Sequence, residues 1–158
     1  MIHSVDMTQH SILDADTHFI VNPVNCEGIM GAGLAKAFKE RFGYEYFQAY
    51  RKDCALGNLV PGTATTWWTS KRLPDGSLQR VINLPTKGKW RDKSNLTGIV
   101  TACRFVHREI MDWRHSVAIP MLGCGLGGLD WRDVRPALVE VFNGFVDTDC
   151  YFYETVGG

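Results

Sequence analysis

The apolar positions of this chain follow two spacings, one typical of strands and one typical of helices. Runs of β-forming residues predict strands near 2–5, 17–21, 63–69, 78–84, 116–121 and 149–155. Apolar residues three or four positions apart predict helices at 34–42, 44–54, 96–113 and 130–145. Strands and helices interleave, apart from one hairpin that turns at Asp75-Gly76. We therefore expect a single domain over residues 1–158, folded as a three-layer α/β/α sandwich with a mixed central sheet.

Two of these helices have boundaries that depend on single residues. Ser94 or Asn95 can cap the helix at 96–113, since either side chain can accept a hydrogen bond from an amide of the first turn. Pro136 would interrupt the last helix if that helix began at Trp131, because proline lacks an N–H and clashes with the preceding turn. An N-cap at Asp133 would instead place Pro136 in the first turn, where proline is tolerated.

Two glycine-rich loops each connect a predicted strand to a predicted helix. The first, at 22–34, has three glycines within six residues, and the second, at 120–129, repeats the design about a hundred residues later. Such loops deliver bare backbone N–H groups to a helix N-terminus, where unpaired amides and the helix dipole favour phosphate. One loop alone could serve only tight helix–strand packing. Two at the same sheet edge predict two phosphates, or one diphosphate held from both sides. Neither loop fits the dinucleotide or P-loop signature.

Composition narrows the class of protein. Lys plus Arg and Asp plus Glu both number 17, so any nucleic-acid binding would have to come from a local site. The five cysteines are widely spaced without metal-like pairing, as is typical of free thiols in a reducing compartment. The N-terminus lacks a signal-peptide pattern, and no apolar run approaches the roughly 18 residues that span a bilayer. We expect a cytoplasmic monomer that uses no membrane, metal or cofactor.

The whole chain resembles a macrodomain, the ADP-ribose-binding fold. The resemblance is carried by Asp6-Met7-Thr8, Asn22-Pro23-Val24-Asn25, Gly28-Ile29-Met30-Gly31-Ala32-Gly33 and Gly123-Cys124-Gly125-Leu126-Gly127-Gly128-Leu129-Asp130-Trp131. More narrowly, Pro85-Thr86-Lys87 with Trp90-Arg91 is similar to the branch that contains the DarG antitoxin macrodomain, which removes ADP-ribose from DNA. The human terminal ADP-ribose protein glycohydrolase is a more distant member of that branch.

The resemblance implies a role for each candidate residue. Lys87 would be catalytic at the anomeric carbon of the distal ribose, and Asn25 would hold hydroxyls of that ribose. Asp6 would accept a hydrogen bond from the adenine amino group, and the ring that stacks on adenine would be Tyr153, unless that family position falls on Glu154. The other implied ligand-binding residues are Met7, Asn22, Gly28, Ile29, Met30, Gly31, Gly33, Leu34, Thr86, Gly123, Cys124, Gly125, Leu126, Gly127 and Gly128.

The reaction that the resemblance implies would depend on Lys87. Breaking a glycosidic bond to ribose develops oxocarbenium character, so hydroxyl positioning and a nucleophile or proton donor beside C1″ are needed. A partly buried lysine could act as that nucleophile through a lowered pKa and form a covalent adduct with the opened sugar. The alternative is a solvated loop lysine that pairs with phosphate.

The second loop departs from part of the family. Some relatives of the human glycohydrolase type carry an acidic residue where this chain has Gly127. A lysine–aspartate pair is therefore unavailable from that position, and the proton-transfer partner of Lys87 stays open. Asp130 lies three residues later and is expected to cap the following helix instead. This departure favours the bacterial branch that acts on DNA.

The loop that carries Lys87 also contains Lys89, Trp90, Arg91 and Lys93. Cations with an interleaved aromatic ring suit single-stranded nucleic acid, although Trp90 could also pack inward. The resemblance thus implies a hydrolase that removes ADP-ribose from DNA bases, with ADP-ribosylated single-stranded DNA as substrate and a cognate ADP-ribosyltransferase toxin as a partner. The alternatives are hydrolysis of protein-linked ADP-ribose or ADP-ribose 1″-phosphate, and a reader module that cleaves nothing. We expect a stand-alone protein or an excised domain.

Overall fold

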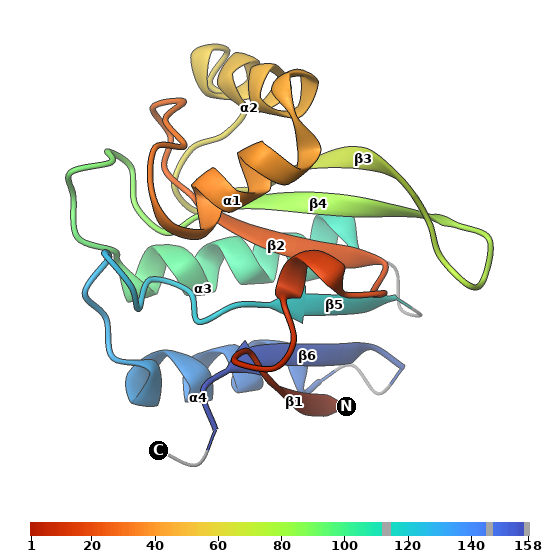
Figure 1. The fold of residues 1–158 in the computed structure, drawn as a ribbon. Helices are drawn as coiled ribbons and strands as arrows, with labels where there is room; N and C mark the ends of the chain where they lie inside the picture. Colours follow the sequence, from red (N-terminus) through yellow and green to blue (C-terminus); the bar gives the residue numbers. More distant parts are fainter. Residues whose placement is uncertain (112–114, 145–146, 157–158) are drawn as a thin grey trace.

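A mixed six-stranded sheet forms the centre of the computed structural model, which describes residues 1–111, 115–144 and 147–156 (Figure 1). The strand order is β1-β6-β5-β2-β4-β3, and every neighbouring pair is parallel except β3 with β4. The strands are β1 (Ile2–Asp6), β2 (Phe19–Val24), β3 (Thr65–Arg72), β4 (Leu78–Pro85), β5 (Ser116–Ile119) and β6 (Asp149–Glu154). The predicted mixed sheet and its one hairpin are confirmed.

Helices cover both faces of this sheet. Figure 1 shows α3 and α4 behind the sheet, with α1 and the short η1 in front and α2 above them. The helices are η1 (Ile12–Asp14), α1 (Gly33–Phe42), α2 (Tyr44–Ala55), α3 (Leu96–Phe105) with its π-helical continuation η2 (Val106–Ile110), and α4 (Trp131–Phe142). The predicted three-layer α/β/α sandwich is therefore confirmed.

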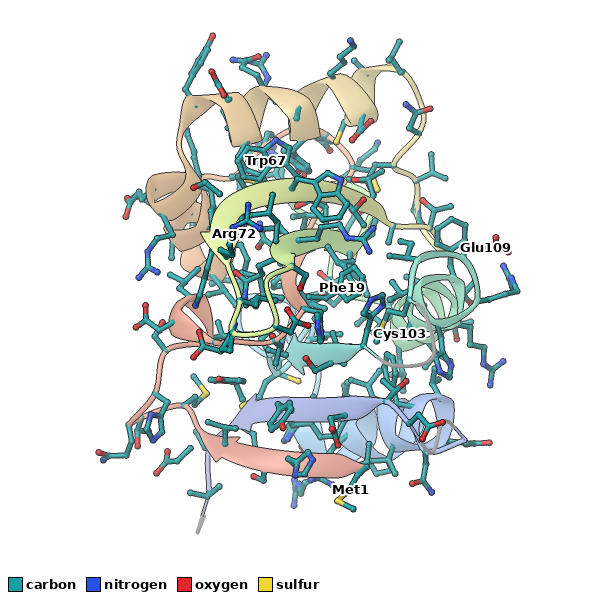
Figure 2. All side chains as sticks on the ribbon, turned by 90° about the vertical axis from the view of Figure 1, so that its right-hand side faces the viewer. Met1, Phe19, Trp67, Arg72, Cys103 and Glu109 are labelled. Atoms are coloured by element: carbon teal, nitrogen blue, oxygen red, sulfur yellow. The ribbon has the colours of Figure 1, made fainter. Side chains whose placement is uncertain are left out.

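Two separate cores follow from the alternation of side chains along the strands. Phe19 on β2 packs in the layer beneath α3 and α4, where it lies with Cys103 of α3 (Figure 2). Ile20, its neighbour, points the other way and packs with Tyr46 of α2. Trp67 of β3 joins the second core, with its ring centroid 5.2 Å from that of Tyr46. Because both faces are buried, the central strands are apolar on both sides.

The boundaries of the last helix differ from one of our expectations. α4 begins at Trp131, and the Asp130 carboxylate caps it by accepting a 2.9 Å hydrogen bond from the Arg132 amide. The predicted cap at Asp133 is wrong, and the predicted capping role of Asp130 is confirmed. Pro136 consequently lies inside the helix, where the carbonyl one turn earlier loses its N–H donor. Burial of the apolar face of α4 holds the helix together despite this loss.

The start of β2 also differs slightly from the predicted one, and one of the two candidate caps of α3 is confirmed. β2 starts at Phe19 rather than Thr17, whose hydroxyl bonds to the Phe19 carbonyl at 2.7 Å. Asn95, not Ser94, caps α3 by accepting a 2.9 Å hydrogen bond from the Gly98 amide. The predicted apolar positions Trp113 and Phe145, and the tail at 157–158, lie outside the described residues.

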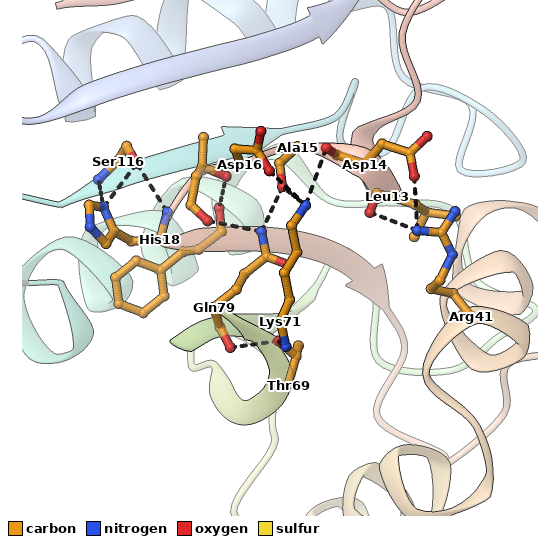
Figure 3. Close-up of polar contacts among 12 residues, drawn as sticks. Leu13, Asp14, Ala15, Asp16, His18, Arg41, Thr69, Lys71, Gln79 and Ser116 are labelled. Carbon is orange, nitrogen blue, oxygen red and sulfur yellow. Dashed lines mark hydrogen bonds and ion pairs between the residues drawn. The ribbon is translucent and has the colours of Figure 1, made fainter. Parts of the chain in front are cut away.

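The segment that joins η1 to β2 is tied down by three other elements (Figure 3). Arg41 of α1 donates to the Leu13 carbonyl at 3.0 Å, and Lys71 of β3 donates to the Ala15 carbonyl at 2.9 Å. Gln79 of β4 is fully buried and also donates to the Ala15 carbonyl, at 2.8 Å. The two bonds to Ala15 lie near the amino ends of β2 and β4, and together with the Arg41 bond they hold η1 against α1 and the β3–β4 hairpin. No helix in the described part of the chain is both long and apolar enough to cross a membrane.

Candidate functional site

A cleft of about 1550 Å³ opens at the carboxyl ends of the parallel strands. Its walls come from the β2–α1 loop (residues 25–32), the β4–α3 loop (residues 86–95), the β5–α4 loop (residues 120–130) and the chain that follows β1. Figure 1 shows the first three loops together at one side of the sheet. This is the edge where open α/β sheets bind ligands.

Most of the predicted site residues share this one cleft. The lining includes Met7, Asn25, Ile29, Gly31, Gly33, Leu34, Thr86, Lys87, Gly123, Cys124, Gly125, Leu126, Gly127 and Tyr153. Asp6, Asn22, Gly28, Met30 and Gly128 are outside it. The fold therefore brings both glycine loops and Lys87 to a single cavity.

Three predicted ligand residues are buried behind the cleft instead, which corrects the predicted set. Asn22 is fully buried, and its amide donates to the Tyr46 hydroxyl at 2.7 Å. Met30 is 2% exposed and packs in the core beneath α1 and α2. Gly28 is also buried, with Arg51 of α2 packed against it. These three residues support the β2–α1 loop from behind, so they do not face the cleft.

The Tyr46 hydroxyl links two buried amides, and its loss should be costly. It accepts from Asn22 and donates to Asn83 Oδ1 at 2.5 Å. Tyr46→Phe leaves both amides in the core without this partner, so we expect the free energy of unfolding to fall by about 1–3 kcal/mol. Urea denaturation measures this loss. Tyr44→Phe, which changes an exposed tyrosine, is the matched control. Equal stability of the two variants would contradict the expectation.

The predicted adenine end of the cleft contains Tyr153, which is half-buried and lines the cleft. Glu154, the alternative candidate, points to the opposite face and pairs with Arg135 at 2.8 Å. Asp6 lies just outside the lining, and its Oδ1 accepts from the Thr8 hydroxyl at 2.7 Å and the Thr8 amide at 2.9 Å. These bonds lower the pKa of Asp6, so its carboxylate stays an acceptor. Its contact with adenine stays a prediction.

Asn25 organises the β2–α1 loop from within. Its Oδ1 accepts from the Glu27 amide at 3.0 Å and from the Tyr50 hydroxyl at 2.9 Å, and its Nδ2 donates to the Ile29 carbonyl at 2.8 Å. Asn25 is 7% exposed, yet it lines the cleft. The Oδ1 atom and one Nδ2 hydrogen bond to the loop and to Tyr50, so the second Nδ2 hydrogen is left for a ligand.

Backbone amides face the cleft from two loops. Within the described residues, the amides of Gly31, Ala32, Gly33 and Leu34 have no hydrogen-bond acceptor, and α1 has no side-chain cap. The amides of Gly125, Leu126 and Gly127 are likewise without an acceptor in the described chain. Because Asp130 caps α4, the second loop offers only its own amides rather than an open helix end. Both arrangements suit an anion such as a diphosphate.

Gly127 is a glycine because another residue occupies the space beside it. A Cβ at this position would lie 2.0 Å from Ser94 Oγ and 2.6 Å from the Gly123 carbonyl oxygen. Ser94 also donates its amide to the Gly127 carbonyl at 3.0 Å. The β4–α3 and β5–α4 loops are therefore packed directly together, and no acidic side chain fits at 127 in this arrangement.

Substitution of Gly127 should disturb the second loop. We expect Gly127→Ala to lower the free energy of unfolding by about 1–3 kcal/mol, because the new methyl group overlaps Ser94 and backbone oxygen. Gly125→Ala is the matched control, since a Cβ there meets nothing within 4 Å. Chemical denaturation of both variants checks this, and a Gly127→Ala protein as stable as Gly125→Ala would refute the packing explanation.

Lys87 lies between the two glycine loops, half-buried in the lining. The adjacent Thr86 amide donates to the Val24 carbonyl at 3.0 Å, and the Gly88 carbonyl accepts from the Cys26 amide at 2.7 Å. These bonds attach the β4–α3 loop to the β2–α1 loop on both sides of the lysine. The backbone at Lys87 is thus held in place in the wall of the cleft that both glycine loops line.

Thiol and metal chemistry have little support at this site. Burial raises the pKa of Cys26 and of Cys124 to about 11, so both remain protonated thiols near neutral pH. Among the described residues, no three His, Cys, Asp or Glu side chains come close enough to hold a metal ion. Two amines, those of Lys87 and Lys93, line the cleft, and Lys87 is the one for which the sequence resemblance implies a catalytic role.

Some residues of the site were not foreseen as such. Gln9, His10, Ser11 and Ile12 line the cleft, although nothing in their pattern distinguishes them from a surface connection. Tyr50 was identified only as an anchor of the second helix, and its spacing gives no sign that its hydroxyl binds Asn25.

Comparison with known proteins gives consistent matches. A family model described as Macro domain matches residues 21–138. The DNA ADP-ribosyl glycohydrolase of Mycobacterium tuberculosis (strain ATCC 25618 / H37Rv) is 42% identical over 148 residues, which cover 93% of this chain and 41% of that protein. A DNA ADP-ribosyl transferase-DNA ADP-ribosyl glycohydrolase fusion protein of Thermosipho africanus is 29% identical over 153 residues, 85% of this chain and 39% of that protein. The chain spans about two fifths of the length of both relatives.

A solved structure agrees in fold and extent. The macrodomain of Mycobacterium tuberculosis DarG matches with a TM-score of 0.86 and 40% sequence identity, covering 97% of both chains.

Proposed function

This chain belongs to the Macro domain family, and we propose that it is a glycohydrolase that releases ADP-ribose from modified DNA bases. The observation that carries the proposal is the position of Lys87 in a cleft between two loops with free amides. The name of the 42% identical relative supports DNA as the carrier of the ADP-ribose. The absence of room for an acid at Gly127 fits a reaction that relies on the lysine alone.

The ligand fills the cleft in one direction. The diphosphate lies against the free amides of the two loops, whose N–H groups stabilise its charge. The adenine extends toward Tyr153, and the distal ribose extends toward Asn25 and Lys87. The base that carries the ADP-ribose then leaves the cleft beside the β4–α3 loop.

Lys87 acts as the nucleophile in this proposal. In its neutral form, Nζ attacks C1″, a C–N bond forms, and the bond from C1″ to the base nitrogen breaks with its electron pair going to the base. The first proton lost from Nζ neutralises the base. The C1″–O4″ bond then breaks, O4″ takes the second proton of Nζ, and the opened sugar is left joined to Lys87 as an imine between Nζ and C1″. Water then attacks C1″ of the adduct, which releases ADP-ribose and returns the amine. The net reaction consumes one water, and the chain needs no cofactor for it.

A transferase partner is the natural source of the substrate. One relative combines a DNA ADP-ribosyl transferase and a glycohydrolase in one protein. We therefore propose that this chain reverses the action of a cognate DNA-directed ADP-ribosyltransferase toxin. We further propose that it does so as a monomer in the cytoplasm.

Competing substrates test the assignment. The protein is incubated separately with ADP-ribosylated single-stranded DNA, ADP-ribosylated protein and ADP-ribose 1″-phosphate, and released ADP-ribose is measured by mass spectrometry. We expect release from the DNA to be fastest. Faster release from protein or from the 1″-phosphate would overturn the DNA assignment, and ADP-ribose binding without any release would indicate a reader module.

A further inference from the structure

The charged side chains of the cleft all come from one loop. Among the described residues that line it, those with formal charge are Lys87, Arg91, Asp92 and Lys93, all from the β4–α3 loop. Lys89 belongs to the same loop and is exposed. The side of the cleft formed by this loop is therefore cationic, whereas the glycine loops contribute amides and apolar side chains.

An exposed tryptophan stands at the tip of this loop. The Asp92 amide donates to the Lys89 carbonyl at 3.0 Å, which closes a turn with Trp90 and Arg91 at its two central positions. The Asp92 carboxylate also accepts from the Lys89 amide at 3.1 Å, so the acid of the loop is used to hold the turn. Trp90 is 46% exposed, and the Arg91 guanidinium lies 5.0 Å from its ring centroid. The alternative of an inward-packed Trp90 is therefore wrong.

The loop is also held in place before any ligand binds. Its first part is bonded to the β2–α1 loop through Gly88, and its last part is bonded to the β5–α4 loop through Ser94. The Asn95 amide closes the loop by donating to the Thr86 carbonyl at 3.0 Å. The backbone that carries the aromatic ring and the cations is thus ordered before binding, which lowers the entropic cost of binding.

We propose that this turn binds the DNA strand next to the modified base: a neighbouring base stacks on Trp90, and strand phosphates contact Lys89 and Arg91. The inference rests on the proposed function, because it assumes that the modified base leaves the cleft beside Lys87. Stacking on an exposed aromatic ring combined with backbone contacts from cations is the way proteins hold single strands. The turn therefore sets a preference for strands over isolated nucleosides.

The diphosphate of ADP-ribose is a poorer explanation for these groups. Free amides of both glycine loops already serve that anion. A diphosphate also gives no reason for a tryptophan that is nearly half exposed at a turn. Charge complementarity and the aromatic ring together favour a single strand over a peptide, which has no regular series of phosphates.

Two substrates with the same modified base test the proposal. One is an ADP-ribosylated mononucleoside, and the other is a single-stranded oligonucleotide of about ten nucleotides that carries the modification centrally. We expect wild-type protein to have a higher kcat/KM on the oligonucleotide. Trp90→Ala should reduce that kcat/KM by about 5- to 150-fold, the usual cost of one lost base stack. Lys89→Ala and Arg91→Ala should each reduce the salt dependence by about 0.7 in the log–log slope.

The controls separate strand binding from ADP-ribose binding. Trp68→Ala removes another exposed tryptophan, on β3 and outside the cleft lining, and should leave kcat/KM on both substrates unchanged. Trp90 also lines the cleft, so the loss of affinity of Trp90→Ala for free ADP-ribose, measured by calorimetry, should be smaller than its loss of affinity for the modified oligonucleotide. An equal loss with free ADP-ribose would place Trp90 against the ADP-ribose and overturn the proposal. Equal wild-type kcat/KM on oligonucleotide and mononucleoside would overturn it too.

Failure of the proposed function gives a different result. If wild-type protein releases ADP-ribose from neither substrate, the glycohydrolase assignment fails, and the binding affinities then decide the present inference. Tighter binding of the modified oligonucleotide than of free ADP-ribose, lost in Trp90→Ala, supports the strand site. Equal affinities for the modified oligonucleotide and for free ADP-ribose would exclude the strand site. Tighter binding of an ADP-ribosylated peptide than of the oligonucleotide, lost in Trp90→Ala, would also exclude it.

Discussion

Lys87→Arg should abolish the release of ADP-ribose while free ADP-ribose still binds. Arginine keeps the positive charge in the cleft. Because its guanidinium stays protonated, it cannot attack C1″. We expect the turnover rate kcat to fall by about 10²- to 10⁴-fold, the range for loss of one catalytic group. Single-turnover release from ADP-ribosylated DNA measures the rate, and calorimetry measures the affinity for free ADP-ribose. Lys52→Arg, on the exposed surface of α2, is the matched control.

A trapped intermediate would identify the role of the lysine more closely. If Nζ forms a covalent bond with the opened sugar, borohydride reduction during turnover should add the mass of ADP-ribose to the protein at Lys87. A Lys87→Arg protein that still turns over would refute the mechanism. If Lys87→Arg loses all turnover but no adduct is trapped in the wild type, the lysine is essential without being a nucleophile. Its role would then be proton donation to the base.

Asn25→Ala should weaken ADP-ribose binding because it releases the loop that carries the free amides. The Asn25 side chain holds that loop by three hydrogen bonds. Two join it to backbone atoms of the loop, at Glu27 and Ile29, and one joins it to the Tyr50 hydroxyl. Losing bonds that together contribute about 1.5–3 kcal/mol predicts a Kd for ADP-ribose about 10- to 100-fold higher. Calorimetric titration of wild type and variant with ADP-ribose measures the change.

Tyr50→Phe separates loop support from direct contact with the ribose. Tyr50 is fully buried and outside the cleft lining, and its hydroxyl bonds to the Oδ1 and the carbonyl oxygen of Asn25, each at 2.9 Å. Burial raises the pKa of Tyr50 well above its ordinary value, so the hydroxyl remains a donor at neutral and alkaline pH. A weaker affinity in this variant as well would show loop support. If only Asn25→Ala weakens binding, the Asn25 amide acts on the ribose itself.

The layers and the glycine loops could be predicted because they depend on local patterns. Leu34, Phe38 and Phe42 are spaced as on one face of a helix, and Gly43 stops that helix with a φ of 88°. Strands interleaved with such helices bring both loops to the same sheet edge. The prediction that both glycine loops lie at one sheet edge followed from topology, and the structure confirms it, because Gly31 and Gly125 line the same cleft.

The errors come from contacts between distant parts of the chain. Asn22 belongs to the quoted motif, but strand alternation turns its side chain toward Tyr46, 24 residues later. No local pattern shows that Ser94 fills the space beside Gly127. The position of Pro136 predicted a later start for the last helix. The helix begins at Trp131 because the Asp130 cap and the burial of Val134 on the inner face outweigh the one lost hydrogen bond.

The position of the distal ribose is the central claim, and a crystal structure of the protein with ADP-ribose tests it most directly. The measured quantity is the distance from Lys87 Nζ to C1″. We predict about 3–3.5 Å, a distance from which the amine can attack, with the diphosphate on the amides of Gly31–Leu34 and Gly125–Gly127. A ligand bound in the opposite direction, with adenine beside Lys87 and C1″ beside Tyr153, would contradict the mechanism.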